Sequence, residues 1–286
     1  MKRLLLSATA LFAILNASAE EQTVVLTTSQ PEGQTITLLV NATRAGVTVD
    51  WGDGTPQAYT STTNGGVLEI SGTLKGANVT VKAAKGWKML AATDAGLTAV
   101  DLSKATELRS LYLQNNALTS VNVANMPELR DLNLANNQLT AVTLNSSKNP
   151  LIETLDLSNN PITATSFIYG QANLRYLNLS GMDYTSLTLT KDVNLDALLV
   201  ANNALKTLTL TATKDISLID VRGNNLEKMT MPTDGLPQLQ QLLADDNYLE
   251  DLDISASTDI NTLTVARNAT SKVTPPSTTK PQAYDS

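Results

Sequence analysis

The stretch LRSLYLQNNALTSVNV, residues 108–123, decides the fold of this chain. Its apolar residues stand at fixed distances from Leu108, and Asn116 stands at offset 8 from that residue. The next block opens at Leu129 and repeats these offsets as far as Asn137. The chain therefore contains an internal repeat, whose blocks are spaced by 21 to 23 residues. Nine blocks share the offsets, and they open at Trp87, Leu108, Leu129, Ile152, Leu174, Leu195, Ile216, Leu239 and Ile260.

Each offset in the first half of the repeat has a physical meaning. Offsets 3 and 5 alternate with polar residues, as Leu111 and Leu113 do, which predicts a short strand with one face inward. The Asn at offset 8 follows that strand, where its side chain can bond backbone groups that the turn leaves without partners. A single such Asn would be an ordinary turn residue, but seven at one offset predict an internal ladder: Asn116, Asn137, Asn160, Asn203, Asn224, Asn247 and Asn268.

The second half of the repeat is also apolar at every other position. Val121 and Val123, or Leu208 and Leu210, stand at offsets 13 and 15 with a polar residue between them. This period of two indicates extended segments rather than helices on the opposite side of the coil. We therefore expect a slim coil with short strands on both sides, whose apolar residues are buried only by stacking on the neighbouring coils.

The pattern L-x-x-L-x-L-x-x-N-x-L resembles that of leucine-rich repeat proteins, and the short repeats resemble those of internalin-like adhesion proteins. The resemblance implies a mainly β, right-handed solenoid of about nine repeats over residues 87–269. Two blocks depart from the pattern. One has Met182 in the Asn position, and the other has Pro161 after its Asn. Their longer spacings predict an inserted surface loop near Tyr169-Gly170.

Residues 20–86 do not repeat, and they predict a small β-sandwich. Trp51-Gly52-Asp53-Gly54 directly follows a predicted strand and resembles the turn of polycystic-kidney-disease-type (PKD), Ig-like domains. Asp53 could bind calcium, but one carboxylate is far from a site of six to eight oxygens, so a turn-forming Asp is favoured. Since a solenoid needs capped ends, this domain is expected to cap the first repeat. Strands are predicted at 23–26, 35–40, 47–51, 67–70 and 78–81.

The whole arrangement resembles a family of secreted Bacteroides-type leucine-rich repeat proteins. The matching residues are the β segment Val49 to Thr55 and the repeat segment Leu97 to Ser103. This resemblance covers nearly the whole chain after residue 19, and it implies a fold more specifically than it implies a partner.

The two ends of the chain carry their own signals. Residues 1–19 have Lys2 and Arg3, then a short apolar run and small residues at 17–19, which predicts a cleaved signal peptide. About 12 apolar residues are too few for a membrane span. We therefore expect an extracytoplasmic protein, in the periplasm, on the outer surface or released. Residues 270–286 are rich in Ser, Thr and Pro. This tail either covers the last repeat as a strand or leaves the solenoid end open to association.

The composition excludes several kinds of site. The chain has no Cys and no His, which removes disulfides, zinc-thiolate sites and Ser-His-Asp or Cys-His catalysis. The net charge of -7 disfavours nucleic acid and anionic lipid as partners. No cofactor and no metal site are predicted.

The candidate binding residues lie on the concave face, where the side chains at offsets 2, 4 and 6 point outward. Tyr residues are enriched at binding hot spots, and apolar residues in outward positions suggest a partner. The ordinary alternative is that cross-strand neighbours tolerate Tyr and Leu there. The Asp residues could also be catalytic carboxylates, but an open surface offers no pocket to raise the pKa of one of them. The candidates are Tyr112, Asp131, Asp156, Tyr176, Leu199, Leu218, Asp220, Leu243 and Asp245.

These observations favour a secreted or cell-surface recognition and adhesion module that binds a protein or a glycan, with host-derived ligands among the candidates. The alternative is a structural component of the cell envelope that self-assembles weakly through the solenoid ends. A carbohydrate-active enzyme is disfavoured, and we expect no enzymatic activity.

Overall fold

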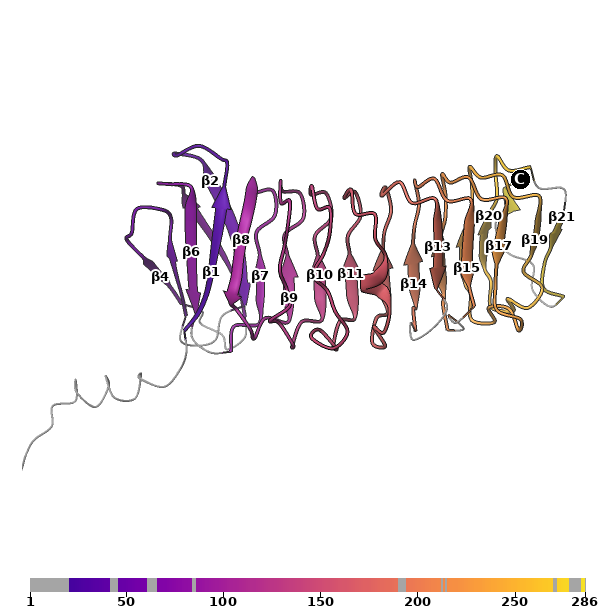
Figure 1. Ribbon diagram of the computed structural model, residues 1–286, viewed down its shortest axis with the longest axis horizontal. Coiled ribbons are helices and arrows are strands. Elements are labelled where there is room, and N and C mark those ends of the chain that lie inside the picture. Colours follow the sequence, from indigo (N-terminus) through magenta and orange to yellow (C-terminus); the bar gives the residue numbers. More distant parts are fainter. Residues whose placement is uncertain are drawn as a thin grey trace, which may run out of the picture.

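The computed structural model describes residues 21–41, 46–60, 66–83, 86–189, 194–211, 213, 215–269 and 272–277, together with the backbone of 284–285. The predicted signal peptide lies outside these residues. The described chain is almost entirely β and forms an elongated stack of coils, with the N-terminal strands at one end (Figure 1).

One long sheet runs the whole length of the molecule. It has 12 strands, of which nine are the short parallel strands predicted in the first half of each repeat, and these occupy offsets 2 to 4. Their register keeps equal offsets side by side, so that Leu111 pairs with Leu132 and Leu132 with Leu155. The predicted repeat register is therefore confirmed. The nine strands are β7 (Met89–Ala91), β9 (Ser110–Tyr112), β10 (Asp131–Asn133), β11 (Thr154–Asp156), β12 (Tyr176–Asn178), β14 (Ala197–Leu199), β16 (Leu218–Asp220), β18 (Gln241–Leu243) and β20 (Thr262–Thr264).

The opposite side carries shorter sheets. The first repeat contributes β8 (Leu97–Lys104). Later repeats form one sheet of β13 (Ser186–Leu189), β15 (Thr207–Leu210) and β17 (Lys228–Thr230), and another of β19 (Asp251–Asp253) and β21 (Lys272–Thr274). Strands are thus present on both sides of the coil, as predicted.

The middle repeats differ on this opposite side, because segments 121–123 and 142–144 form no strands. There the Thr143 hydroxyl forms the hydrogen bonds to the neighbouring coil that backbone groups form in the strands. It accepts a hydrogen bond from Val123 N at 3.2 Å and donates one to Val121 O at 3.2 Å. In the next repeat, the one with Pro161, a 3-10 turn replaces the strand at Ser166–Ile168, and the exposed Tyr169 follows it.

The N-terminal strands continue the two layers of the solenoid. Strand β2 (Thr35–Asn41) pairs with β7 and with β5 (Val67–Thr73), which extends the long sheet. The other layer is a sheet in the order β4-β3-β6-β1-β8. The five predicted strands are all present, and β4 was not predicted. The strands of this layer that precede β8 are β1 (Gln22–Thr28), β3 (Val47–Asp50), β4 (Gln57–Tyr59) and β6 (Asn78–Ala83).

The turn around Trp51 is a packing point of this region. Trp51 is buried, and its indole N–H donates to the hydroxyl of Tyr59 at 3.2 Å. Its ring leaves no room for a side chain at Gly72, where an added Cβ would lie 2.0 Å from the indole. Asp53 accepts a hydrogen bond from Thr55 N and pairs with Lys75 at 2.6 Å, so its carboxylate serves the turn and an ion pair.

The tail adds partners to both layers at the other end. Strand β21 pairs with β19, and β22 (Tyr284–Asp285) pairs with β20, each in parallel. Leu263 pairs with Tyr284, so the register of the repeat continues past residue 270. The described parts of the tail therefore follow the first of the two alternatives, covering the last repeat with strands.

The predicted Asn ladder holds the stack together internally. The Asn137 side-chain amide donates to Leu113 O in the preceding coil at 2.9 Å and to Leu134 O in its own coil at 3.0 Å. Its Oδ1 accepts from Leu118 N at 3.0 Å. Asn116, Asn160, Asn203, Asn224, Asn247 and Asn268 bond their preceding coils in the same way.

A second, exposed ladder stands at offset 7 and was not predicted. This position has a positive φ in all nine repeats, a conformation that Asn, Asp and Gly tolerate best. Asn136 donates to Asn115 Oδ1, and Asn159 donates to Asn136 Oδ1, both at 2.8 Å. Gly181 and Gly223 interrupt the row.

We expect Asn137→Ala to lower the free energy of unfolding by about 2–4 kcal/mol, because it leaves several buried backbone groups without partners. The matched control is Asn136→Gly, which keeps the left-handed conformation and removes only exposed hydrogen bonds. It should cost less than about 1 kcal/mol. Urea denaturation measures both changes, and equal losses would contradict a dominant role for the internal ladder.

Tyr184 predicts a stability change at high pH. It is buried, its hydroxyl has no hydrogen-bond partner in the described part of the chain, and burial raises its pKa to about 12. Since the folded state holds the neutral phenol, stability is complete below pH 10 and falls as the pH rises toward 12.

Tyr184→Phe should therefore reduce the loss of stability between pH 10 and 12 by on the order of 2 kcal/mol, with little change at pH 7. Urea denaturation of both proteins at pH 7 and pH 11 measures this difference. An unchanged loss at pH 11 would show that other groups cause it.

Candidate binding surface

The candidate residues belong to one outward surface, here called the long-sheet face. It consists of the side chains at offsets 2 and 4 on the nine repeat strands, together with the aligned positions of β2 and β5. Among the described residues, no other strand or helix packs over this face. The offset-4 row is Ala91, Tyr112, Asn133, Asp156, Asn178, Leu199, Asp220, Leu243 and Thr264, and the offset-2 row is Met89, Ser110, Asp131, Thr154, Tyr176, Ala197, Leu218, Gln241 and Thr262.

Neither row contains a Lys or an Arg. Cations stand instead at offset 1, along one margin of the face, and carboxylates neutralise them. Arg109 pairs with Glu128 at 3.3 Å, and Arg175 pairs with Asp196 at 3.6 Å. The other margin carries the exposed ladder of offset 7. The centre of the face therefore combines neutral and acidic side chains between two polar margins.

The predicted acidic residues of the middle repeats are held by hydrogen bonds to their neighbours. Ser110 donates to Asp131 Oδ2 at 2.8 Å. Asp156 accepts from the backbone N–H and the hydroxyl of Ser158 at 3.0 and 2.7 Å, and from the Asn178 amide at 3.1 Å. These contacts cap the strand ends and leave each carboxylate half-buried on the surface.

Asp220 and Asp245 are tied more closely into the structure. Asp220 is only 6% exposed and forms a two-pronged pair with Arg222, at 2.9 Å to Nε and 2.7 Å to Nη2. Hydrogen bonding and charge from Asp220 raise the pKa of Arg222. Asp245 accepts from Ala266 N at 2.8 Å and from the Thr264 hydroxyl. Asp220 is thus buried and Asp245 half-buried, and both carboxylates hold backbone or side-chain groups of the C-terminal coils.

Tyr112 and Tyr176 are both half-buried on the face, in different rows and with two repeat strands, β10 and β11, between them. Burial first, and then the nearby Asp131, raises the pKa of Tyr112. Burial and Asp156 act in the same way on Tyr176. Both phenols are therefore neutral hydrogen-bonding groups with part of the ring available for contact.

The three predicted leucines are also half-buried. Asn178, Leu199, Asp220 and Leu243 follow one another in the offset-4 row, so the buried carboxylate of Asp220 separates the two leucines of this row. Leu218 stands in the neighbouring row beside Ala197. The apolar patch of the C-terminal half is thus divided and less exposed than the sequence suggested.

Sequence reasoning missed two more exposed residues of this face, because it ended the surface at the first repeat. Leu39 on β2 and Val67 on β5 are 37% and 57% exposed, the largest values among the apolar residues of the face. A signal was present in the sequence, since the consecutive Leu38 and Leu39 of one strand must point to opposite sides of the sheet.

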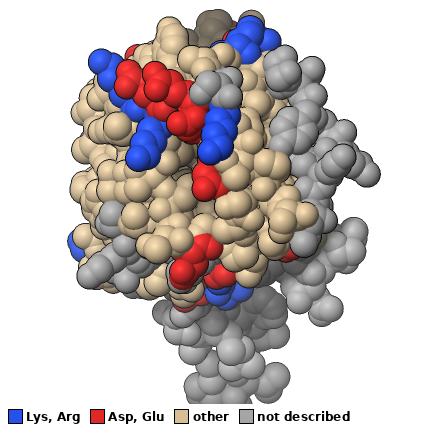
Figure 2. Space-filling view, turned by 90° about the vertical axis from the view of Figure 1, so that its right-hand side faces the viewer, with Lys and Arg blue, Asp and Glu red and all other residues tan. Residues whose placement is uncertain are grey.

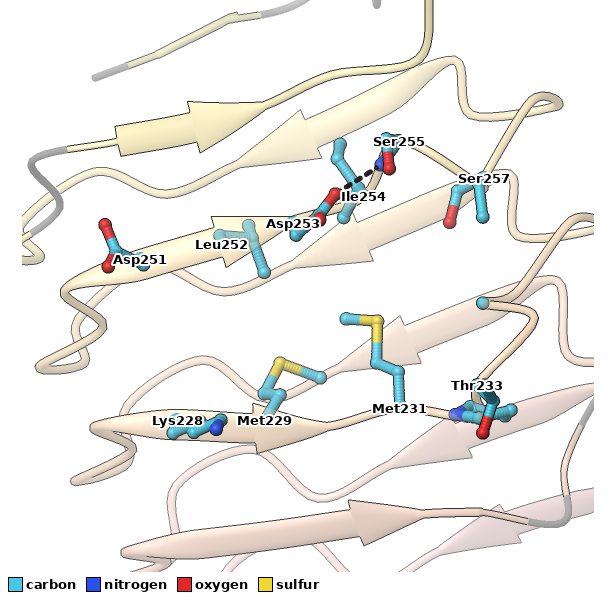
Figure 3. A pocket seen from close by; sticks show the side chains of 13 residues that line it. Lys228, Met229, Met231, Thr233, Asp251, Leu252, Asp253, Ile254, Ser255 and Ser257 are labelled. Carbon is cyan, nitrogen blue, oxygen red and sulfur yellow. Dashed lines mark hydrogen bonds between the residues drawn. The ribbon is translucent and has the colours of Figure 1, made fainter.

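A groove of about 340 Å³ lies on the opposite side of the coil, between β17 and β19 (Figure 3). These two strands belong to separate sheets, because the repeat between them contains two extra residues and a turn closed by Gly235 N to Pro232 O at 2.8 Å. Met229 and Met231 line one wall, and Leu252 and Ile254 line the other. Charged residues line it on both sides, Lys228 on the strand of the methionines and Asp251 and Asp253 on the other strand.

At the C-terminal end of the molecule, one group of acidic and basic side chains extends from the top to the middle of the visible surface, and a smaller group lies near the bottom (Figure 2). Within the described ranges, no three residues of the types His, Cys, Asp or Glu come close enough to hold a metal ion. In the same ranges, no helix has the length and apolar character required to cross a bilayer.

Comparison with known proteins supports the fold. The family model described as leucine rich repeats, in two copies, matches residues 106–146. The functional domain of InlJ from Listeria monocytogenes, which includes a cysteine ladder, is 20% identical with a TM-score of 0.60. The match covers 67% of this chain and 43% of that one, so the chain spans less than half of its length.

Two other solved structures are similar at TM-scores below 0.5. YopM from Yersinia enterocolitica is 22% identical, with a TM-score of 0.47 and coverage of 59% of this chain and 40% of that one. A leucine-rich repeat protein of Leptospira interrogans is 16% identical, with a TM-score of 0.48 and coverage of 64% and 55%. No curated protein sequence matches the chain. The chain thus has the leucine-rich repeat solenoid fold, and none of these comparisons indicates a catalytic family.

The structural role of Asp220 can be tested by removing its charge. Asp220→Asn should lower the free energy of unfolding by about 1–2 kcal/mol, because it weakens a charge-assisted pair at a buried carboxylate. The matched control, Asp246→Asn, weakens the exposed pair with Arg267 and should cost less than about 1 kcal/mol. Thermal denaturation measures both changes. A larger loss for Asp246→Asn would contradict this assignment.

Proposed function

We propose that this protein is a secreted or cell-surface recognition module that binds a protein partner on the long-sheet face. The observation that carries the proposal is the outward surface itself, which spans the 12-stranded sheet with polar, aromatic and apolar side chains and is not packed against any other described element. Solenoids use such extended sheet surfaces for binding. The fold is typical of protein-binding modules.

The chemistry of the face suits recognition better than catalysis. Its carboxylates are hydrogen-bonded to neighbouring residues on an open sheet face, as Asp131 and Asp156 are. Tyr112 and Tyr176 supply amphipathic ring surface, which is common at binding hot spots. A glycan partner would need more such rings, so a protein partner is the better match to this face.

The location and the cap belong to the same proposal. Residues 1–19 have the composition of a signal peptide, which supports export of the chain. We assign residues 20–86 as a PKD-like cap of the solenoid. The strand pairings of β2 with β7 and of β1 with β8 support this role, because they cover the edges that the first coil would otherwise expose.

End-to-end assembly is the second candidate function. Strand β5 supports it, since this seven-residue strand forms the N-terminal edge of the long sheet and pairs on one side only, with β2, in the described structure. Such an edge can add a strand from another copy. In this case the protein would be a structural component of the cell envelope.

The test of the proposed function is recovery of partners by cross-linking from surface and extracellular protein fractions, with tagged wild-type protein and face variants. Tyr112→Ala, Tyr176→Ala and Leu243→Asp should each reduce recovery of the same partner at least fivefold, because they remove contact area from the face. Thr209→Ala, on the opposite side in β15, is the control and should recover the partner at the wild-type level.

If all three face variants retain full recovery, the long-sheet face is not the binding surface. If the recovered species is the protein itself, the assembly function replaces the recognition function. Circular dichroism of each variant verifies that its fold is kept.

A further inference from the structure

The most exposed apolar side chains of the long-sheet face lie at its N-terminal end, on strands that precede the repeats. Val67 is 57% exposed and Leu39 is 37% exposed. By contrast, Leu199, Leu218 and Leu243 in the repeats are half-buried. Isolated exposed apolar residues are common, so Val67 and Leu39 indicate a binding site only if they lie next to other apolar residues in the sheet.

The strand register joins them to the first repeats. Leu39 pairs with Ala91 on β7, and Ala91 pairs with Tyr112 on β9. In the adjacent row, Asn41 pairs with Val67 on one side and with Met89 on the other. Paired residues of neighbouring strands point to the same side of the sheet and lie about 5 Å apart. Leu39, the nearly buried Ala91 and Tyr112 therefore adjoin in one row, and Val67 and Met89 flank Asn41 in the next row. These five apolar or aromatic residues, Val67, Leu39, Met89, Ala91 and Tyr112, are here called the N-terminal patch, which spans four strands.

The charged side chains nearest the N-terminal patch in the outward rows are carboxylates, while Lys88 and Arg109 at the offset-1 margin are paired with Glu107 and Glu128. Glu69 pairs with Leu39 across β5 and β2, and Asp131 lies on β10 beside Ser110 of β9. As noted above, the two outward rows of the repeat strands contain no Lys or Arg, and the aligned positions Thr35, Thr37, Leu39 and Asn41 of β2 contain none either. An apolar patch bordered by carboxylates complements an apolar side chain flanked by Lys or Arg.

We propose that the N-terminal patch is the anchoring site of the protein's partner, and that it takes a protein segment with a large apolar side chain next to Lys or Arg. This inference rests on the proposed use of the long-sheet face, and it moves the centre of the contact from the repeats to the junction with the cap. The contact chemistry favours protein over glycan, since Val67, Leu39 and Met89 are not aromatic and Tyr112 is the only ring in the patch.

The probe for this site is a phage-displayed library of random 12-residue peptides, selected on the full chain from residue 20 onward. The selected peptides should combine a large apolar residue with an adjacent Lys or Arg. In calorimetric titrations of a synthesised peptide, the double variant Leu39→Thr and Val67→Thr should bind at least tenfold more weakly than wild type. Thr keeps the strand propensity and removes the apolar contact.

Two further variants test the position and the charge of the site. Leu243→Thr removes an apolar side chain of the same face far from the N-terminal patch, and it should weaken binding of the 12-residue peptide clearly less than the double variant does. Glu69→Gln should bind several-fold more weakly at low salt, and the difference should shrink in 0.5 M salt, because screening weakens the interaction between exposed charges. The thermal midpoint of every variant should stay within a few degrees of wild type, since these side chains are partly or largely exposed.

The outcomes separate this inference from the proposed function. If Leu243→Thr abolishes peptide binding and the double variant retains it, the N-terminal patch is not the anchoring site, but the long-sheet face remains the binding surface. Binding that is insensitive to all these variants would overturn both. If the wild-type protein is a dimer in sedimentation velocity and the double variant is a monomer, a second copy of the chain occupies the patch and the inference is overturned. The inference would also be overturned if glycans on an array bind the protein in preference to peptides and Tyr112→Ala loses this glycan binding.

Discussion

The structure depends on the need to satisfy buried backbone groups at every turn of a slim coil. A coil of 21 to 23 residues leaves amide and carbonyl groups facing inward where each strand ends, and no water can reach them. In seven of the nine repeats one Asn meets this need, as Asn137 does by bonding the backbone of two successive coils. Since the bonds run between coils, the same side chain that satisfies one turn also sets the spacing and register of the stack. The aliphatic core and the alignment of the outward rows follow from that register.

The N-terminal strands extend this order instead of forming a separate body. Because β2 joins the long sheet and β1 joins β8, the hydrophobic core continues from Val24 to Val265. The outward rows continue across the same junction, which places Leu39 beside the first repeats. The N-terminal strands thus extend the outward surface as well as the core.

The sequence was sufficient to predict the repeat, the strand register, the Asn ladder and strands on both sides of the coil, because each depends on spacing within one block. It was less informative where contacts depend on pairing between distant segments. The position of Val67 on this face depends on its pairing with Asn41 in another strand, and no local sequence pattern predicts that pairing. The Asp residues of the face were identified as outward, but their partners, such as Arg222 for Asp220, come from turn geometry that offsets alone do not give. The offset-7 ladder could have been found, since paired Asn residues such as Asn115-Asn116 recur at one position.

The separation of β17 from β19 has a mechanical consequence. The coils on either side of it remain joined by β16 and β18 in the long sheet, while no strand pairing connects them on the opposite side. A rod with continuous hydrogen bonding on one side and a thioether-lined gap on the other resists bending unequally in the two directions. This junction is one compliant point of the stack, where the C-terminal coils can tilt by opening or closing the gap while the long sheet acts as the hinge.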